Sequence, residues 1–148
     1  IKSVVASMYR EEITEMVGEL FSDLSGLNMS EELAGINWGI SVGMTDKGKL
    51  IGFYLLSETN EPFGKLKGSG LQGVALGLKE EYRGRGLRDM FLDYAHNLGF
   101  DYIWGEHDKR LNNLSQWLKV RKFLGSNEDS HFTYKILRTS SNHQFDQT

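Results

Sequence analysis

The sequence predicts an α+β domain in which a mixed β-sheet is flanked by helices. Segments with the alternating or continuous apolar pattern of strands are interleaved with segments whose apolar residues recur every three or four positions. The chain has 148 residues, of which 39% are hydrophobic and 25% charged, as expected for one globular domain. A hairpin makes antiparallel neighbours, whereas strand–helix–strand units require parallel ones, so the sheet is expected to be mixed.

The first half of the chain is expected to hold a helix followed by a hairpin. Apolar residues from Ile13 to Leu24 follow the i, i+3, i+4 spacing of one helix face. Asp46–Lys49 has the composition of a tight turn between two strands. The predicted elements are a helix at Ser7–Leu24, a short helical piece at Ser30–Ile36, and strands at Trp38–Met44 and Leu50–Ser57. Ser57–Gly70 contains the only proline and three glycines, and is expected to be a flexible connection.

The second half is expected to alternate strands with helices. The predicted elements are a strand at Gly73–Leu78, a helix at Leu87–Leu98, a strand at Tyr102–His107, a helix at Asn112–Phe123 and a strand at His131–Arg138. Gly99 follows the first of these helices as a stop signal. Residues 1–138 are therefore expected to form a single domain, and the polar residues 139–148 a loose tail.

The composition excludes several functional classes. The chain has no cysteine, which rules out disulfides, thiolate metal sites and a cysteine nucleophile, and fits a cytoplasmic location. No apolar run approaches the roughly 20 residues that cross a bilayer. A net charge of −3 offers no general attraction to nucleic acids or anionic membranes, so neither is an expected partner. The four histidines lack the close spacing of metal ligands, so no metal site is expected.

The most informative segment is the basic turn Tyr82-Arg-Gly-Arg-Gly-Leu-Arg88, between a predicted strand and a predicted helix. Gly84 and Gly86 permit positive φ angles and close approach of a ligand to the backbone. The helix that begins near Leu87 leaves its first amide hydrogens unpaired, which suits a phosphate or pyrophosphate group. A glycine turn with solvated arginines is the simpler alternative. The glycine spacing matches neither the dinucleotide-binding nor the Walker motif.

The segment Leu78–Leu87 resembles motif A of the GNAT acyltransferases, in which a strand, a Tyr-Arg-Gly-Arg/Lys-Gly turn and a helix follow one another. The resemblance implies a central twisted sheet flanked by helices, and transfer of an acetyl group from acetyl coenzyme A (acetyl-CoA), the co-substrate, to an amine. It also implies that main-chain groups of the strand and turn bind this coenzyme. The implied residues are Leu76, Gly77, Leu78, Arg83, Gly84, Arg85, Gly86, Leu87 and Arg88.

A second part of the chain is similar to motif B of the same family. Asn112–Ser115 resembles the start of the motif B helix and Lys122–Gly125 its end, so Asn113 would contact the pantetheine arm. Basic residues around that helix could meet the 3′-phosphate of the coenzyme or simply face solvent. They are Lys109, Arg110, Lys119, Arg121 and Lys122.

Two residues depart from the family pattern. Arg88 stands where Gly or Ala is usual, and Val120 stands where many members have a tyrosine that protonates the departing thiolate. The alternative is therefore a catalytically weak or inactive GNAT-like protein that binds coenzyme A (CoA) or a protein partner.

The implied reaction needs a base for the attacking amine and a proton donor for the thiolate, but no side-chain nucleophile. His107 and Glu106, at the end of a strand, are candidate bases, and histidine has an ordinary pKa of about 6.5. Glu58 is a rival that would act through water. Ser115 and Tyr134 are candidate proton donors. A structural role remains the alternative for each of these residues. The acceptor is expected to be a small amine or a protein amino group.

Overall fold

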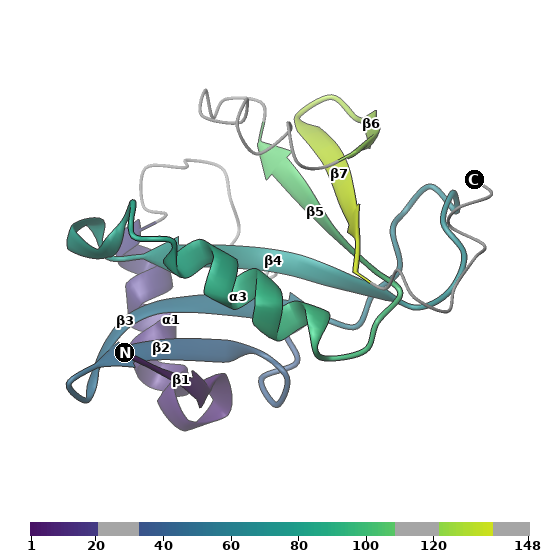
Figure 1. Cartoon of the computed structure of the whole chain (residues 1–148). Coiled ribbons are helices and arrows are strands. Elements are labelled where there is room, and N and C mark those ends of the chain that lie inside the picture. The colour runs from purple at the N-terminus through teal and green to yellow at the C-terminus, as the bar shows by residue number, and fades with distance from the viewer. Residues whose placement is uncertain (21–32, 109–121, 138–148) are drawn as a thin grey trace. The chain divides into compact units, whose positions relative to one another are not determined.

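The computed structural model describes residues 1–20, 33–108 and 122–137. Its elements are the strands β1 (Lys2–Val5), β2 (Val42–Asp46), β3 (Lys49–Ser57), β4 (Gly70–Leu78), β5 (Tyr102–Asp108), β6 (Lys122–Ser126) and β7 (Ser130–Ile136), the helices α1 (Arg10–Leu20) and α3 (Leu87–His96), and the 3-10 turns η1 (Ala6–Tyr9) and η2 (Glu80–Tyr82). The strands form one sheet in the order β1-β2-β3-β4-β5-β7-β6 (Figure 1). Because β4 and β5 are parallel whereas β2 and β3 are antiparallel, the sheet is mixed and the predicted α+β class is confirmed.

The chain folds into two compact units. Unit 1 comprises Ile1–Ser57 and Val74–Asp93, and unit 2 comprises Glu58–Gly73 and Tyr94–Thr148. The single domain expected over residues 1–138 stays a prediction, and the tail 139–148 lies outside the described residues. Within the described ranges, no helix combines the length and the hydrophobicity that crossing a membrane requires.

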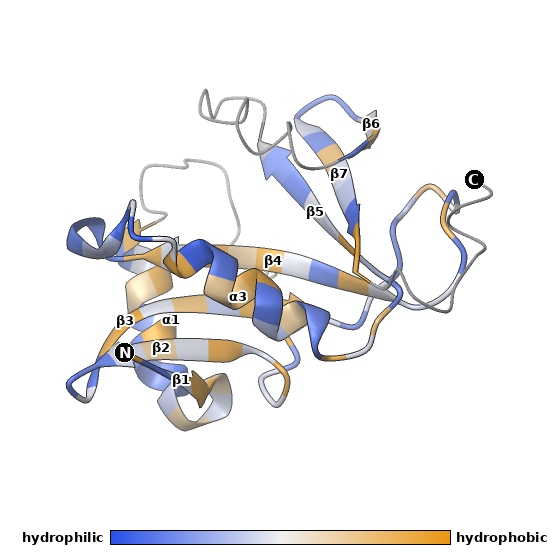
Figure 2. Ribbon diagram, in the orientation of Figure 1, coloured by the Kyte–Doolittle hydropathy of each residue, from blue (hydrophilic) through white to orange (hydrophobic). Residues whose placement is uncertain are grey.

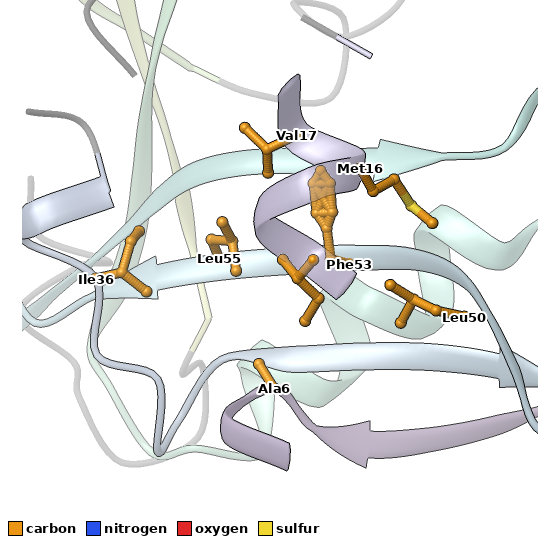
Figure 3. Close-up of a cluster of buried hydrophobic side chains, with 8 residues drawn as sticks. Ala6, Met16, Val17, Ile36, Leu50, Phe53 and Leu55 are labelled. Atoms are coloured by element: carbon orange, nitrogen blue, oxygen red, sulfur yellow. The ribbon is translucent and has the colours of Figure 1, made fainter. Parts of the chain in front are cut away.

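The core of unit 1 forms where α1 packs on β3. Ile13, Met16 and Val17 lie at the predicted helical spacing and are buried against Phe53 and Leu55 (Figure 3). Full burial of one such side chain contributes about 1.5–3 kcal/mol. The helical periodicity of this segment therefore comes from a face that is fully covered by the sheet.

Helix α3 covers the opposite face of the same strands in unit 1 (Figure 1). Side chains alternate along a strand, so Tyr54 points away from Phe53 and packs against Phe91 of α3, with 6.0 Å between ring centroids. Figure 2 shows hydrophobic and hydrophilic residues alternating along α3, as in an amphipathic helix. The helix ends at His96, two residues before the predicted end at Leu98, and Gly99 follows with the positive φ of 86° expected of a stop signal.

The start of the chain differs from the prediction. Lys2–Val5 is a strand paired with β2, and the 3-10 turn Ala6–Tyr9 precedes the helix, which begins at Arg10 rather than Ser7. The tight turn places Ala6 in the core between α1 and β3, where its side chain is fully buried. The predicted continuation of the helix beyond Leu20 lies outside the described residues, as do residues 30–32 of the predicted Ser30–Ile36 piece. In the rest of that piece, Leu33 and Ala34 are helical and a turn follows at Gly35.

The predicted hairpin is confirmed, although its first strand begins later than expected. Lys47 and Gly48 both have positive φ, which suits the twist of a two-residue hairpin loop. The segment from Trp38 does not join the strand, because the amides of Ile40 and Ser41 donate to the carbonyl of Asn37 and close a turn. The strand therefore begins at Val42.

Unit 2 has its own core on one face of β5 and β7. Tyr102, Trp104, Leu124 and Phe132 are buried together. Phe63 packs edge-on against Phe132 at 5.1 Å between ring centroids. Aromatic pairs of this kind add to the stability that burial of their surface provides.

The connection between β3 and β4 has no helix or regular strand, as predicted, but hydrogen bonds anchor it to β5. The indole nitrogen of Trp104 donates to the Thr59 carbonyl at 2.6 Å, and the Glu61 amide donates to the Tyr102 hydroxyl at 3.0 Å. The Glu61 side chain is only 6% exposed, and its carboxylate accepts the amides of Phe63, Lys65 and Leu66. The segment is therefore a hydrogen-bonded loop and not the flexible connection that was expected.

The helix predicted at Asn112–Phe123 is wrong at its C-terminal end. Residues 109–121 lie outside the described residues, but Lys122 and Phe123 begin β6 and pair with Tyr134 and Thr133 of β7. Strand pairing supplies main-chain hydrogen bonds that outweigh the weak helical preference of this segment. Lys122–Gly125 therefore belongs to a strand and does not close a helix.

Candidate functional site

The basic turn lies between β4 and α3, as predicted. After β4, the amide of Tyr82 donates to the Lys79 carbonyl and closes the turn η2. Gly84 and Gly86 then adopt φ angles of 77° and 76°. The prediction of positive φ at both glycines is confirmed, and glycine is favoured there because a Cβ would strain the backbone.

The space beside the two glycines is open. A Cβ added to Gly84 or Gly86 would meet no atom within 4 Å. The neighbouring Arg83, Arg85 and Arg88 are exposed. A ligand could therefore approach the backbone of this turn closely, so the residues fit the pyrophosphate of a coenzyme.

The N-terminus of α3 follows directly. Leu87 is only 6% exposed and anchors the first turn of the helix in the core of unit 1. The first amides of a helix have no partner within it, and the partial positive charge there favours an anion. The arrangement places these amides next to the two open glycines.

Hydrogen bonds and a ring contact hold the turn. Arg83 donates through Nε to the Leu78 carbonyl at 3.1 Å, which ties the turn to the end of β4. The Arg85 guanidinium lies 5.0 Å from the Tyr82 ring centroid. Arg83 and Arg85 thus each contact the protein while both side chains stay exposed.

The contact between Asp46 and the residue before the turn was not predicted from the sequence. The Asp46 carboxylate accepts a 2.6 Å hydrogen bond from the Tyr82 hydroxyl, and this bond is the main reason that the pKa of Tyr82 is raised. Thirty-six positions separate the two residues, and the hairpin pattern around Asp46 carries no signal of such a contact.

The end of β4 owes its glycine to packing. A Cβ at Gly77 would lie 2.6 Å from the Phe53 ring and 2.8 Å from Leu20 of α1. Leu78 is 8% exposed, and Leu76 is partly buried. Gly77 is therefore explained by the core of unit 1, whatever its main chain binds.

The candidates that the structure describes belong to unit 2, and strand register decides how Glu106, His107 and Tyr134 are arranged. Trp104 lies opposite Tyr134 and Glu106 opposite Phe132, whereas His107 lies opposite His131. Opposite residues in an antiparallel pair share a face, and successive residues alternate. Glu106 and Tyr134 are therefore on one face of the ladder, and His107 is on the other.

His107 is held by a buried neighbour on its own face. Its Nε2 lies 2.9 Å from the hydroxyl oxygen of Thr133, which is 1% exposed. Glu106 and Glu58 are exposed, and Glu58 precedes the Thr59 carbonyl that Trp104 holds. Asn113 and Ser115 lie outside the described residues, as do Val120 and, except for the exposed Lys122, the predicted basic cluster.

The described residues contain no group of three or more histidine or acidic side chains that could hold a metal ion.

Comparisons with known proteins place the fold. No model of a known protein family and no curated protein matches the sequence. An aminoglycoside 6′-N-acetyltransferase complexed with coenzyme A is similar at a TM-score of 0.67 and 12% identity, over 96% of this chain and 100% of that one. A GNAT-family acetyltransferase from Listeria monocytogenes is similar at a TM-score of 0.63 and 15% identity, over 91% and 94%.

A third similar structure is NAA60 from Arabidopsis thaliana in complex with acetyl-CoA. Its TM-score is 0.56 and its identity 18%, over 82% of this chain and 92% of that one. The chain thus has the fold of GNAT acetyltransferases, as the resemblance of its motif A implied.

Proposed function

We propose that this protein is an acyl-CoA-dependent N-acyltransferase that transfers acetyl from acetyl-CoA to an amine by direct attack. One observation carries the proposal: the turn at Gly84 and Gly86 has positive φ at both glycines, open space beside them and a helix N-terminus next to it. The fold neighbours support it at a coarser level, since two of them were solved with coenzyme A or acetyl-CoA bound.

In this proposal the turn holds the pyrophosphate of the coenzyme. The main-chain amides from Gly84 to Arg88 donate to it, and Arg85 adds positive charge within the turn. The main chain of Leu76–Leu78 serves the pantetheine arm, with Asn113 as a further contact. The bound coenzyme supplies an activated thioester, and the protein positions it and manages protons.

His107 is the proposed base. A base works best when a second group fixes its orientation, and the contact with buried Thr133 provides this for His107. Glu58 and Glu106 are the rival bases. With His107 as the base, Ser115 is the proposed donor to the thiolate. Tyr134 shares a face with Glu106 and would be the donor if Glu106 were the base.

The second candidate function is binding of coenzyme A or a protein partner without efficient catalysis. Val120 in place of the usual tyrosine and Arg88 in place of a small residue favour it. The acceptor amine, small or on a protein, and a cytoplasmic location are part of the main proposal.

Calorimetric titration with acetyl-CoA tests the proposal, followed by thiol release across a panel of amines. Binding together with amine-dependent thiol release is expected. Binding without release would favour the second candidate. Absence of both binding and a rise in melting temperature at millimolar acetyl-CoA would overturn the enzyme and the coenzyme-binding functions together, because a ligand of the folded state must stabilise it. Only binding of a protein partner would then stand.

A further inference from the structure

We infer that Asp46, in the β2–β3 hairpin, is a positioning residue for the coenzyme's diphosphate and acts through Tyr82. The inference rests on the proposed function. The Tyr82 hydroxyl donates to Oδ2 of Asp46 at 2.6 Å, a length typical of a hydrogen bond to an ionised carboxylate. Tyr82 is the last residue of η2 and stands immediately before the turn that carries Gly84 and Gly86.

Asp46 is itself held in a defined place. It pairs with Lys49 across the two-residue loop, where Lys47 and Gly48 have φ angles of 52° and 79°. A hairpin loop of this type sets the register of both strands. The backbone that carries the Asp46 carboxylate is therefore placed by strand pairing on one side and by the hairpin loop on the other.

Two further contacts anchor the same turn. The amide of Lys79 donates to the Ile51 carbonyl of β3 at 2.9 Å, and Arg83 donates to the Leu78 carbonyl at 3.1 Å. Both of these bonds end on a main-chain carbonyl, whereas the bond between Tyr82 and Asp46 joins two side chains. Contacts within unit 1 therefore hold the main chain of Lys79 before η2 and the side chains of Tyr82 and Arg83 at and after its end.

The position of the Tyr82 ring also affects Arg85, the charged side chain within the turn. The Arg85 guanidinium rests on its ring at 5.0 Å from the centroid, and Arg85 lies between the two open glycines. With the hydroxyl held by Asp46, the ring offers Arg85 a fixed surface. A turn ordered before the ligand arrives loses less conformational entropy on binding, so affinity rises.

The direction in which coenzyme affinity changes when Asp46 is removed distinguishes a positioning role from a purely electrostatic effect. A carboxylate near a diphosphate repels it, so by charge alone the loss of Asp46 would tighten coenzyme binding. By positioning, the loss of Asp46 weakens binding. The two effects therefore predict opposite changes for the same substitution.

The experiment is calorimetric titration of acetyl-CoA into the wild-type protein and the variants Asp46→Ala, Asp46→Asn, Tyr82→Phe and the double variant Asp46→Ala/Tyr82→Phe. Affinity is expected to fall about ten-fold in each non-bonding single variant and no further in the double variant. Asp46→Asn keeps an oxygen acceptor and is expected to restore most of the affinity. Tyr82→Phe keeps the ring under Arg85, so it isolates the hydroxyl.

Glu81→Ala is the matched control. It removes an acidic side chain that influences Tyr82 through its charge, whereas Asp46 also accepts the hydrogen bond from the Tyr82 hydroxyl. It is expected to bind acetyl-CoA as tightly as the wild type or more tightly. Circular dichroism of each unliganded variant establishes that the fold is retained.

Unchanged or tighter binding by folded Asp46→Ala would overturn the inference and leave the proposed function standing. A double variant weakened by the product of the two single effects would also overturn it, since the residues would then act independently. A wild-type protein that does not bind acetyl-CoA would overturn the proposed function and this inference with it.

Discussion

His107 and Tyr134 project from opposite faces of the β5–β7 ladder, although their register pairs are only three positions apart. A base and a proton donor that serve one thioester must face the same space. The two residues are therefore not a matched acid–base pair, and single substitutions can separate them.

We expect His107→Ala to lower kcat by about 10²–10⁴-fold, the usual contribution of a general base, while Tyr134→Phe changes kcat little. Thr133→Val should give an intermediate loss, because it removes the oxygen that holds His107. Thiol release at saturating acetyl-CoA measures all three. A large loss in Tyr134→Phe with normal turnover in His107→Ala would contradict His107 as the base and would favour Glu106, which shares a face with Tyr134.

Gly86→Glu is expected to abolish acetyl-CoA binding, because the side chain fills the open space beside the turn with a charge that repels phosphate. Gly86→Ala is the control, since it carries the same strain at a φ of 76° but no charge. Calorimetric titration should detect weakened binding in the alanine variant and none in the glutamate variant. Wild-type affinity in Gly86→Glu would refute the placement of the coenzyme.

Two glycine-to-alanine substitutions should change stability in opposite directions. Gly77→Ala should destabilise unit 1 by about 1–3 kcal/mol, because its Cβ would lie 2.6 Å from Phe53. Gly18→Ala should stabilise the protein by about 0.5–1 kcal/mol, because Gly18 lies in α1 with nothing within 4 Å of its Cβ position. Urea denaturation measures both, and equal signs would contradict the packing described for β4.

The loop between β3 and β4 should depend on Glu61. Glu61→Ala leaves three main-chain amides without their carboxylate partner and should cost about 1–3 kcal/mol. Hydrogen exchange of the Phe63 and Leu66 amides should quicken in that variant. Glu58→Ala, at an exposed position of the same segment, is the control and should leave both stability and exchange unchanged.

Tyrosine ionisation should report the Asp46 contact without any ligand. The hydrogen bond to Asp46 raises the pKa of Tyr82, because deprotonation would break the bond and place two anions together. The stability from this bond is therefore full below the ordinary tyrosine pKa of about 10 and is lost as the pH rises through the raised value. Absorbance titration should show one tyrosine ionising at lower pH in Asp46→Ala, and identical curves would contradict the contact.

Local patterns predicted most of the elements that a single face or turn defines. The helical spacing of Ile13, Met16 and Val17 predicted α1, because these are the residues that the helix buries against β3. The first strand and β6 were missed, since each is short and partly exposed and exists through pairing with a neighbour distant in sequence. Edge strands of this kind carry little apolar periodicity of their own.

The sequence by itself determined the α+β class, the hairpin and the glycine turn ahead of α3, because each depends on neighbouring residues and on the φ angles that glycine permits. Only the tertiary structure decided that Asp46 holds Tyr82, that Gly77 is needed against Phe53, and that His107 and Tyr134 part to opposite faces. These relationships join residues far apart along the chain, and strand register and packing, which local pattern does not encode, bring them together or separate them.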